Sequence, residues 1–580
     1  MHRVFLIPEI LTFIFSCLEL SDPEDLSTQE EDGPNLALYY HLAVTCKTFE
    51  KISLPFLWKN QTTLIPLLIC LSDCFEEIPR SGENSHDDIG LFLRRQPTAE
   101  EWMTLHKYGA LIKEISPPTR RFGPLRYFDE DLVNTLIAEN FLEPLLPNLS
   151  KIDWPIADPR NAHQSLYPIF FSPKLASLSL QSFHQDTHPT QLLQHITDES
   201  PYIEALNLTN LERHEVAETF VSSLAHLRSL TMLGGMKPSI WHALAKMTKL
   251  RVVKLSLIES QLEPDGDNLD MYKNSSTFTD LGQLLIYTNG QKFISTLFPL
   301  YPFPRLQSLE IHGMDLGLTN FTNTVTIVLA AVQRHHLLST LHLSFLYRNH
   351  PDGYPRVTPE NFRPLFSFKN MRVLRIEAGI HYYFDDTFVD ELAHAWPKLQ
   401  HLTISCAYEF KSFSIKVTLQ GLSSFAKNCP DLESLIFPFR LQDDLLHSAA
   451  AAVQDDAASS NSDSNVTTTP DPGPGVSLNL LRIFPITLSP SAIEKTARFL
   501  FGIFPCCLHT FLHRPRSRIN PPFIFPGVQP VNDDDIFSDW IQVATLMDKW
   551  MEECGIVSRK STSSNRVVAN PVYYQARAMY

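Results

Sequence analysis

The sequence lacks any apolar run of the roughly eighteen residues that a bilayer-spanning helix needs. It is also short of positive charge: 48 Lys and Arg stand against 64 Asp and Glu, a formal net charge of −16. Nucleic acids and anionic membranes bind cationic surfaces, so we expect neither as a partner. The apolar start could suggest a signal peptide, but Pro8 and Glu9 interrupt it. We therefore expect a soluble intracellular protein of the cytoplasm, the nucleus or both.

A disulfide or zinc framework is missing as well. The nine cysteines are odd in number and scattered, which is typical of proteins in a reducing compartment. Cys70-x-x-x-Cys74 and the vicinal pair Cys506-Cys507 could be considered a metal or redox pair, but no further ligands stand at zinc spacing beside them. We therefore interpret these cysteines as buried or incidental thiols, and we predict no metal site and no cofactor.

Familiar catalytic motifs are absent too. The sequence contains no Gly-x-Ser-x-Gly elbow, Walker loop, Gly-x-Gly-x-x-Gly turn or His-Glu-x-x-His. His184 and His188 have the spacing of a zinc pair on a helix, but they lie in an expected loop without a third ligand or a general base. We predict that the protein is not an enzyme and has no catalytic residues. A hydrolase built from scattered His and Asp residues is the most distant alternative.

The N-terminal sequence predicts short amphipathic helices. Pro8 suits the first turn of a helix, and Glu9 lies where the helix dipole favours an acid. Apolar residues then recur at helical spacing, first at Ile10, Ile14, Phe15 and Leu18 and later at Val44, Phe49, Ile52 and Phe56. About fifty residues cannot bury so much apolar surface alone. Part of it should contact another protein, or the helices should cap a larger core.

Three segments of this region resemble an F-box: Ile7-Pro-Glu-Ile10, Val44-Thr-Cys-Lys47 and Leu57-Trp58. The resemblance implies an all-α domain at 1–75 that docks on the Skp adaptor of a ubiquitin ligase and through it on a cullin. Phe49 replaces the family's usual Trp, and an acidic insert at 19–32, expected to be a mobile loop, lengthens the first connection. The positions that the resemblance assigns to adaptor binding are Ile7, Pro8, Ile14, Leu18, Val44, Cys46, Leu57 and Trp58.

Beyond Trp102 the pattern Leu-x-x-Leu-x-Leu, or a close variant, recurs along the chain. The copies begin at Leu149, Leu175, Ile203, Leu227, Leu250, Leu306, Leu338, Met371, Leu399 and Leu432. The interval between Leu250 and Leu306 is about double the others, so we expect a degenerate unit between Leu257 and Leu306. The period is typical of leucine-rich repeats, in which each unit adds one strand to a parallel sheet and one helix to the outer face.

Prolines and helical stripes complete the repeat pattern. Six units carry a proline two residues before the first apolar position, where it ends a helix and permits a strand. These prolines are Pro147, Pro173, Pro201, Pro304, Pro397 and Pro430. Between the strands, residues such as Phe388, Leu392 and Trp396 recur every four positions. We therefore predict an α/β fold, with an irregular leucine-rich-repeat solenoid at 76–555 that has parallel strands on its concave face and helices outside. An irregular α/β domain with coincidental leucine spacing is the alternative.

Four further stretches complete the predicted organisation. Residues 442–477 are low in complexity and are expected to be a disordered insert, after which 480–504 resume one more unit. An amphipathic helix at 536–553 is expected to cap the last repeat, and 556–580 are expected to form a disordered tail. The whole ordered chain resembles F-box proteins with C-terminal leucine-rich repeats, which are common in fungi.

This resemblance implies a substrate-recognition subunit of a Skp-cullin-F-box ubiquitin ligase, whose repeats bind an unidentified protein. A repeat scaffold or adaptor outside the ubiquitin system is the alternative. In each strand, the residue between the last two apolar positions should face the concave surface. That column reads Ser179, Asn207, Thr231, Lys254, Glu310, His342, Arg375 and Thr403. We predict that Glu310, His342 and Arg375 bind the substrate, although charged side chains on a concave face can also be simply solvated.

Overall fold

In the computed structural model, the described residues are 7–19, 36–79, 89–116, 126–154, 167–181, 189–209, 218–233, 238–257, 278–288, 303–314, 337–346, 356–378, 381–405, 416–437, 480–482, 490–504, 542–543, 545–547 and 549–550. The chain divides into two compact units, one spanning 1–211 and the other most of 228–559. Among the described residues, no helix is both long and apolar enough to cross a bilayer.

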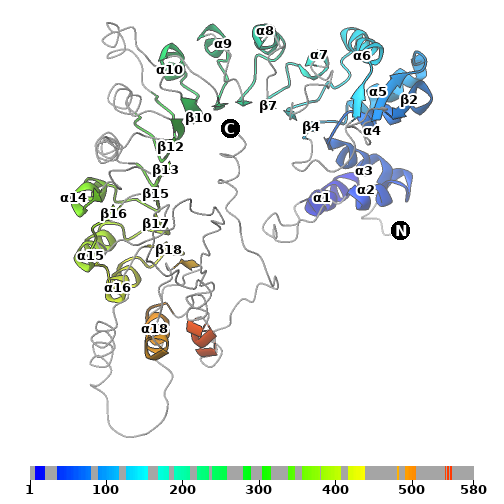
Figure 1. The fold of residues 1–580 in the computed structure, drawn as a ribbon. Coiled ribbons are helices and arrows are strands. Elements are labelled where there is room, and N and C mark those ends of the chain that lie inside the picture. The colour runs from blue at the N-terminus through cyan, green and yellow to red at the C-terminus, as the bar shows by residue number, and fades with distance from the viewer. Residues whose placement is uncertain are drawn as a thin grey trace, which may run out of the picture. The chain divides into compact units, whose positions relative to one another are not determined.

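The first unit begins with helices and continues into parallel strands (Figure 1). Its helices are α1 Pro8–Glu19, α2 Leu36–Ala43, α3 Lys47–Lys59, α4 Ile65–Ile69, η3 Ser72–Cys74, α5 Ala99–Gly109, α6 Glu130–Leu142, α7 Tyr167–Phe170 and α8 Pro189–Glu199. Strands β1 Asn60–Gln61, β4 Glu114–Ile115, β6 Lys151–Trp154, β7 Ser177–Gln181 and β8 Ala205–Thr209 pair in that order, all parallel. A separate small sheet joins β2 Phe75–Pro79, β3 Ile89–Leu93 and β5 Arg126–Phe128.

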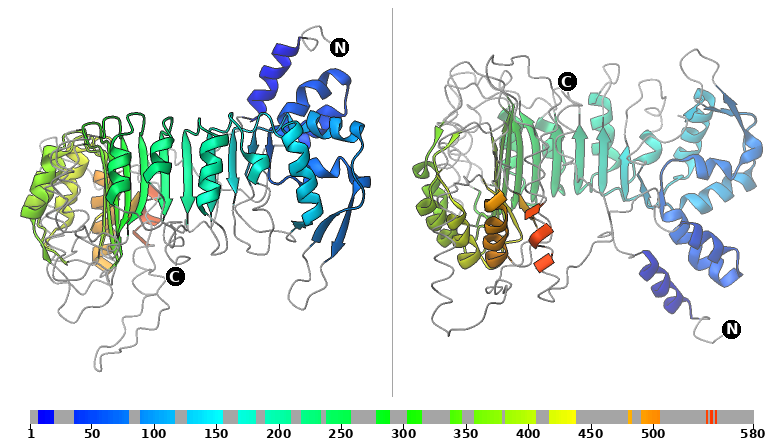
Figure 2. Two further views of the ribbon diagram at one scale, coloured as in Figure 1. Left: turned by 90° about the horizontal axis from the view of Figure 1, so that it is seen from above. Right: turned by 60° about the horizontal axis from the view of Figure 1, so that its bottom comes forward.

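The second unit continues the repeat. Its parallel strands pair in the order β9 Ser229–Leu233, β10 Val252–Leu257, β11 Gln283–Thr288, β12 Ser308–Met314, β13 Thr340–Leu346, β15 Val373–Ala378, β17 His401–Ser405, β18 Ser434–Ile436 and β19 Leu480–Arg482. A two-strand pair joins β14 Arg356–Val357 to β16 His381–Tyr382. The helices are α9 Glu218–Ser223, α10 Pro238–Ala245, α14 Pro359–Phe362, η7 Arg363–Ser367, α15 Asp386–Ala395, α16 Leu419–Asn428 and α18 Pro490–Ile503. Figure 2 shows α14 to α16 along the outer side of this sheet, as the predicted solenoid requires.

The repeated apolar positions form the core. In the long parallel sheet from β10 to β17, each strand buries two of these side chains to 1% exposure or less, for example Val253 and Leu255 on β10 and Leu341 and Leu343 on β13. β11 supplies Leu284 and Ile286 in the same register, so the expected degenerate unit between Leu257 and Leu306 is confirmed. Each inward-facing position of the leucine pattern therefore lies beside the same position of the next strand, and together these residues form continuous apolar columns in the core.

Neighbouring repeats are joined by a recurring main-chain arrangement. The carbonyl oxygen of Arg251 accepts hydrogen bonds from the N–H groups of Gly282 at 2.9 Å and Gln283 at 3.0 Å. The carbonyl of Gln307 accepts from Ser339 and Thr340 in the same way, each at 2.9 Å. One carbonyl thus starts the ladder of the next strand, which satisfies the polar backbone at each entry to the sheet.

Local sequence explains several helix ends. Thr98 and Glu101 form a capping box at α5: the Thr98 N–H donates to Glu101 Oε2 at 2.7 Å, and the Glu101 N–H donates to Thr98 Oγ1 at 3.4 Å. At α15, the side chain of Asp385 accepts from the Phe388 N–H at 2.9 Å. These caps begin helices where the sequence carries a short oxygen-bearing residue.

The structure describes part of the C-terminal region. The described residues of 542–550 are helical, and Trp550 lies 5.8 Å from Phe501 of α18 between ring centroids. The resumed unit is present as β19 and α18. The low-complexity insert at 442–477, the tail at 556–580 and the acidic stretch after Glu19 lie outside the described residues, so those predictions and the domain boundary at 75 stay predictions.

Candidate functional site

The interior of the N-terminal helices is aromatic. Phe15 of α1 lies 6.0 Å from Phe49 and 6.1 Å from Phe56 of α3 between ring centroids, both edge-on. Tyr39 of α2 stacks on Phe56 at 5.3 Å, and its hydroxyl donates to the Phe15 carbonyl oxygen at 3.0 Å. Phe49 therefore helps to join α1 to α3.

The same helices leave large apolar side chains exposed. Val44 is 65% exposed, Ile7 42% and Ile14 37%, and these three belong to the predicted adaptor-binding set. Phe13 and Tyr40, which were not in that set, are also exposed, at 68% and 56%. Such exposed apolar residues on neighbouring helices are the property that a docking surface needs.

The other predicted adaptor-binding residues fall into different environments. Pro8 is exposed, whereas Cys46 and Leu57 are half-buried. The indole of Trp58 stacks on Tyr108 of α5, with the ring centroids 4.9 Å apart, so this side chain also joins α3 to α5. Leu18 lies in α1, but its side chain is outside the described part of the structure. The binding role of these residues stays a prediction.

The predicted concave column is confirmed as an alignment of residues. In the second unit, strand register pairs Glu310 with His342 and His342 with Arg375. Paired residues on neighbouring strands lie about 4.8 Å apart. The predicted column contained no residue between Lys254 and Glu310. In the structure this place is taken by Leu285 of β11. Whether Glu310, His342 and Arg375 bind a substrate stays a prediction.

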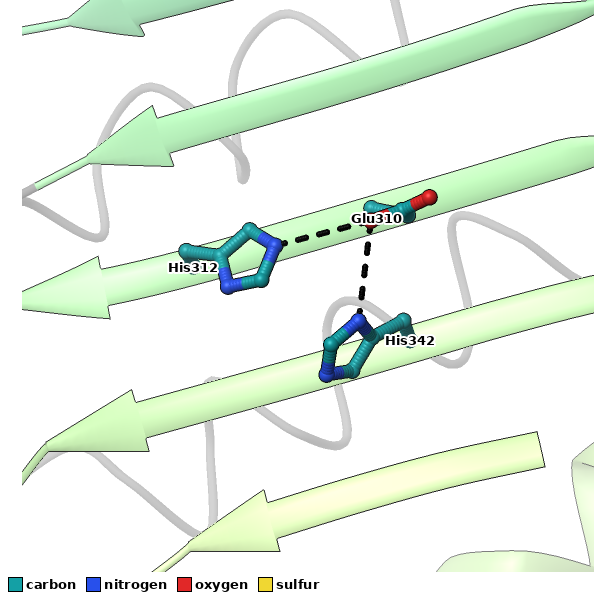
Figure 3. A group of neighbouring side chains, drawn as sticks. All are labelled: Glu310, His312 and His342. Carbon is teal, nitrogen blue, oxygen red and sulfur yellow. Dashed lines mark ion pairs between the residues drawn. The ribbon is translucent and has the colours of Figure 1, made fainter. Parts of the chain in front are cut away.

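A side-chain cluster stands at the centre of this column (Figure 3). Glu310 Oε2 lies 3.6 Å from His312 Nε2 and 3.6 Å from His342 Nδ1. Both imidazoles are only 9% exposed, and their ring centroids are 4.8 Å apart in an edge-on arrangement. Tyr287 stacks on the other side of His312 at 4.9 Å. We call Glu310, His312 and His342 the concave triad.

Electrostatics inside the concave triad favour the charged carboxylate. His312, and then His342, hold the pKa of Glu310 well below its usual range, more than offsetting the opposing effect of its partial burial. The pKa of Tyr287 is raised, first by burial and then by the negative charge of Glu310. Glu310 is therefore the anionic centre of the triad.

His312 is the member of the triad that the sequence prediction missed. The prediction took one residue from each strand, whereas His312 lies two positions beyond Glu310 on β12 and so faces the same side of the sheet. The sequence could have identified His312. Side chains alternate between the two faces of a strand, so the residue after the inward-facing Ile311 is expected to face the concave side, as Glu310 does. Arg375, which was predicted, is exposed and has no ion pair to the triad among the described contacts.

Comparison with known proteins gives little beyond this geometry. No protein-family model matches the sequence, and no curated protein matches it. Among solved structures, a leucine-rich-repeat protein of Leptospira interrogans is similar, at 13% identity, a TM-score of 0.30 and coverage of 62% of this chain and 90% of that chain. The structure of PEPR1-AtPEP1 is similar at 10% identity and a TM-score of 0.26, over 58% of this chain and 49% of that chain. The parallel strands and their buried leucines are the features that identify the leucine-rich-repeat fold.

Proposed function

We propose that this protein is the substrate-recognition subunit of a Skp-cullin-F-box ubiquitin ligase. In this proposal the N-terminal helices dock on the Skp adaptor, the adaptor contacts a cullin, and the repeats hold a protein substrate. The chain itself performs no chemistry, because its contribution is to bring the substrate close to subunits that transfer ubiquitin. The resemblance of 1–75 to an F-box motivates the proposal.

The observation that carries the proposal is the exposure of Ile7, Ile14 and Val44. These residues were assigned to adaptor binding from the sequence, and each leaves more than a third of its surface open to water. The aromatic residues of α1 to α3 pack the helices together, and the apolar surface of Ile7, Ile14 and Val44 that remains exposed is what a partner could cover. Burying apolar surface of this kind stabilises a complex by about 25 cal/mol for each Å².

The decisive experiment measures capture of purified Skp adaptor by the full chain. The double variant Ile14→Lys and Val44→Lys should lose capture, because it places two charges on the proposed apolar interface. The matched control is Met103→Lys with Phe141→Lys, which alters two exposed apolar residues on α5 and α6, 65% and 79% exposed in the parent. That control should capture adaptor like the parent. Equal capture by both double variants would leave the F-box assignment without support.

The double substitution Pro8→Ala and Leu57→Ala gives a second test of the same surface. It should also abolish capture, but Leu57 is half-buried, so circular dichroism must first show that the helices remain folded. If neither double variant affects capture while the chain still binds protein partners through its repeats, the repeat-scaffold alternative is favoured.

Substrate recognition is proposed for Glu310, His342 and Arg375 on the concave face. These residues occupy successive strands at one register position and present both signs of charge. Replacing all three by Ala should weaken capture of repeat-dependent partners and leave adaptor binding unchanged. Affinity purification with mass spectrometry, performed with the F-box intact and deleted, identifies those partners: adaptor and cullin should disappear on deletion, and substrates should remain. Equal recovery of substrates by the triple variant would place recognition elsewhere.

A further inference from the structure

The concave triad has the composition of a metal site: one carboxylate and two imidazoles on adjacent strands. One ligand atom from each of Glu310, His312 and His342 can be chosen so that all lie within 4.8 Å of one another. Figure 3 shows both rings turning a nitrogen toward the carboxylate. The sequence prediction had named no metal ligand, because His342 lies on a different strand from Glu310 and His312 and the three residues have no recognised motif spacing.

We propose that the concave triad binds a divalent transition-metal ion, for which Zn²⁺ is the test ion. Imidazole nitrogen and carboxylate oxygen are preferred ligands of zinc, at about 2.0–2.2 Å from the ion. Tetrahedral geometry at those distances separates two ligand atoms by about 3.4 Å. Both measured separations from Glu310 Oε2, at 3.6 Å, are close to that value. A direct N–H to oxygen hydrogen bond would be about 2.9 Å long, so the spacing fits a shared ion better than it fits direct hydrogen bonds.

The triad is held in position by its surroundings. Glu310 and His342 are register partners on β12 and β13, while His312 lies between the rings of Tyr287 and His342. Little movement is therefore needed beyond closing the two imidazoles toward each other. His342 Nε2 is buried with no hydrogen-bond partner among the described residues. Nδ1 of the same ring faces Glu310, so it is the nitrogen placed to bind an ion together with that carboxylate.

Charge balance also favours a cation. The triad with neutral imidazoles carries one negative charge, which a divalent ion would more than neutralise. On the flanking strand β15, Arg375 pairs with His342 and Glu377 pairs with Ser344. Arg375 is positive and Glu377 is negative, so these two neighbours together add no net charge beside the triad. Three protein ligands leave a fourth position for water, or for a carboxylate or imidazole of a protein bound to the concave face.

The test is metal binding by the full chain after treatment with a chelator. Co²⁺ serves as a spectroscopic substitute for zinc, since tetrahedral cobalt has intense visible absorption, and Zn²⁺ should displace it. The His312→Ala variant should lose one equivalent of bound metal, with a Kd raised at least about 100-fold, because even loss of an outer-shell partner costs 10- to 100-fold. The chain has 22 histidines, so the difference between variants decides the matter and total uptake does not.

The matched control is His401→Ala, since His401 is a half-buried histidine on β17 that lies outside the triad. This variant should keep the metal equivalent and the cobalt spectrum. Glu310→Gln supplies a second test that preserves side-chain shape, and it too should lose the equivalent. Near-ultraviolet circular dichroism under chelation confirms that the variants are folded. Retention of the equivalent by folded His312→Ala and Glu310→Gln overturns the proposal.

The outcome is independent of the proposed ubiquitin-ligase role, because adaptor capture is measured at Ile14 and Val44. Two single substitutions also separate metal binding from substrate recognition on the concave face. Arg375→Ala should affect only the proposed substrate contact, whereas His312→Ala should affect metal uptake first. If His312→Ala also weakens substrate capture only when metal is present, the fourth coordination position is occupied by the substrate.

Discussion

The N-terminal helices and the repeat strands treat apolar side chains in opposite ways. On β10 to β17 the inward residues, such as Leu255 and Leu343, are fully buried. On and around α1 and α2, Phe13 and Val44 are about two-thirds exposed. Each repeat buries its apolar face against the next repeat, whereas the short helices have no such neighbour of their own kind. In this chain the repeated apolar positions form core, whereas the N-terminal helices divide their apolar residues between a small core, as at Phe15, and an exposed surface, as at Phe13.

The largest test of this contrast replaces Trp396, which is fully buried after α15. Its indole N–H donates to the Leu365 carbonyl oxygen at 3.3 Å, and its ring meets Phe366 edge-on at 5.5 Å. Trp396→Ala should lower the free energy of unfolding by about 3–5 kcal/mol, through lost burial and a cavity. Chemical denaturation monitored by circular dichroism measures the change.

The comparison variant is Val44→Ser, which removes an exposed apolar side chain from the N-terminal region. Its effect on stability should stay within about 0.5 kcal/mol, because exposed substitutions seldom cost more. A large loss of stability in Val44→Ser, or a small loss in Trp396→Ala, would contradict the assignment of Val44 to the surface and Trp396 to the core.

A smaller effect is expected at Gly109, the last residue of α5. A Cβ atom placed there would collide with the backbone oxygen of Leu145, so an alanine needs movement of the main chain. Gly109→Ala should destabilise the first unit by about 1–3 kcal/mol, the usual cost of overpacking. The reference substitution is Ala99→Gly at the exposed first turn of the same helix, which alters backbone freedom without a collision. In thermal unfolding, the Gly109→Ala variant should have a lower melting temperature than the Ala99→Gly variant.

The sequence predicted the repeat strands well because each carries three apolar residues at fixed spacing, and burial of that pattern leaves one choice of register. It did not predict β1 and β4, whose two residues each are too short to show a period. The sheet of β2, β3 and β5 was also missed, since its antiparallel and parallel pairings depend on contacts distant in sequence.

The sequence predicted two of the three residues of the concave triad. Glu310 and His342 came from the strand pattern, and their pairing followed from parallel register. The 3.6 Å approach of His312 to Glu310 depends on side-chain rotamers, which spacing alone does not determine. On the N-terminal helices, the sequence could identify an apolar stripe, but only packing separates buried Phe15 from exposed Ile14.

The smallest effect concerns Glu310, which belongs to neither the apolar core nor the apolar surface. Its folded-state pKa is lowered, chiefly by His312 and then by His342. A lowered carboxyl pKa stabilises the fold above the unfolded value of about 4.3, and that contribution is lost as the pH falls through the folded value. Because about a third of the side chain is open to water, we expect less than about 1 kcal/mol from this ionisation.

Urea unfolding of the parent and Glu310→Gln, measured with a chelator present, isolates this contribution. The parent should be the more stable of the two at pH 6, and its advantage should shrink once the pH is below about 4. Glu100→Gln at the exposed start of α5 corrects for the general effect of removing a negative charge from an acidic chain. If the stability difference between the parent and Glu310→Gln grew as the pH fell, the imidazoles would not stabilise the Glu310 carboxylate. The concave triad would then depend on side-chain packing and not on charge.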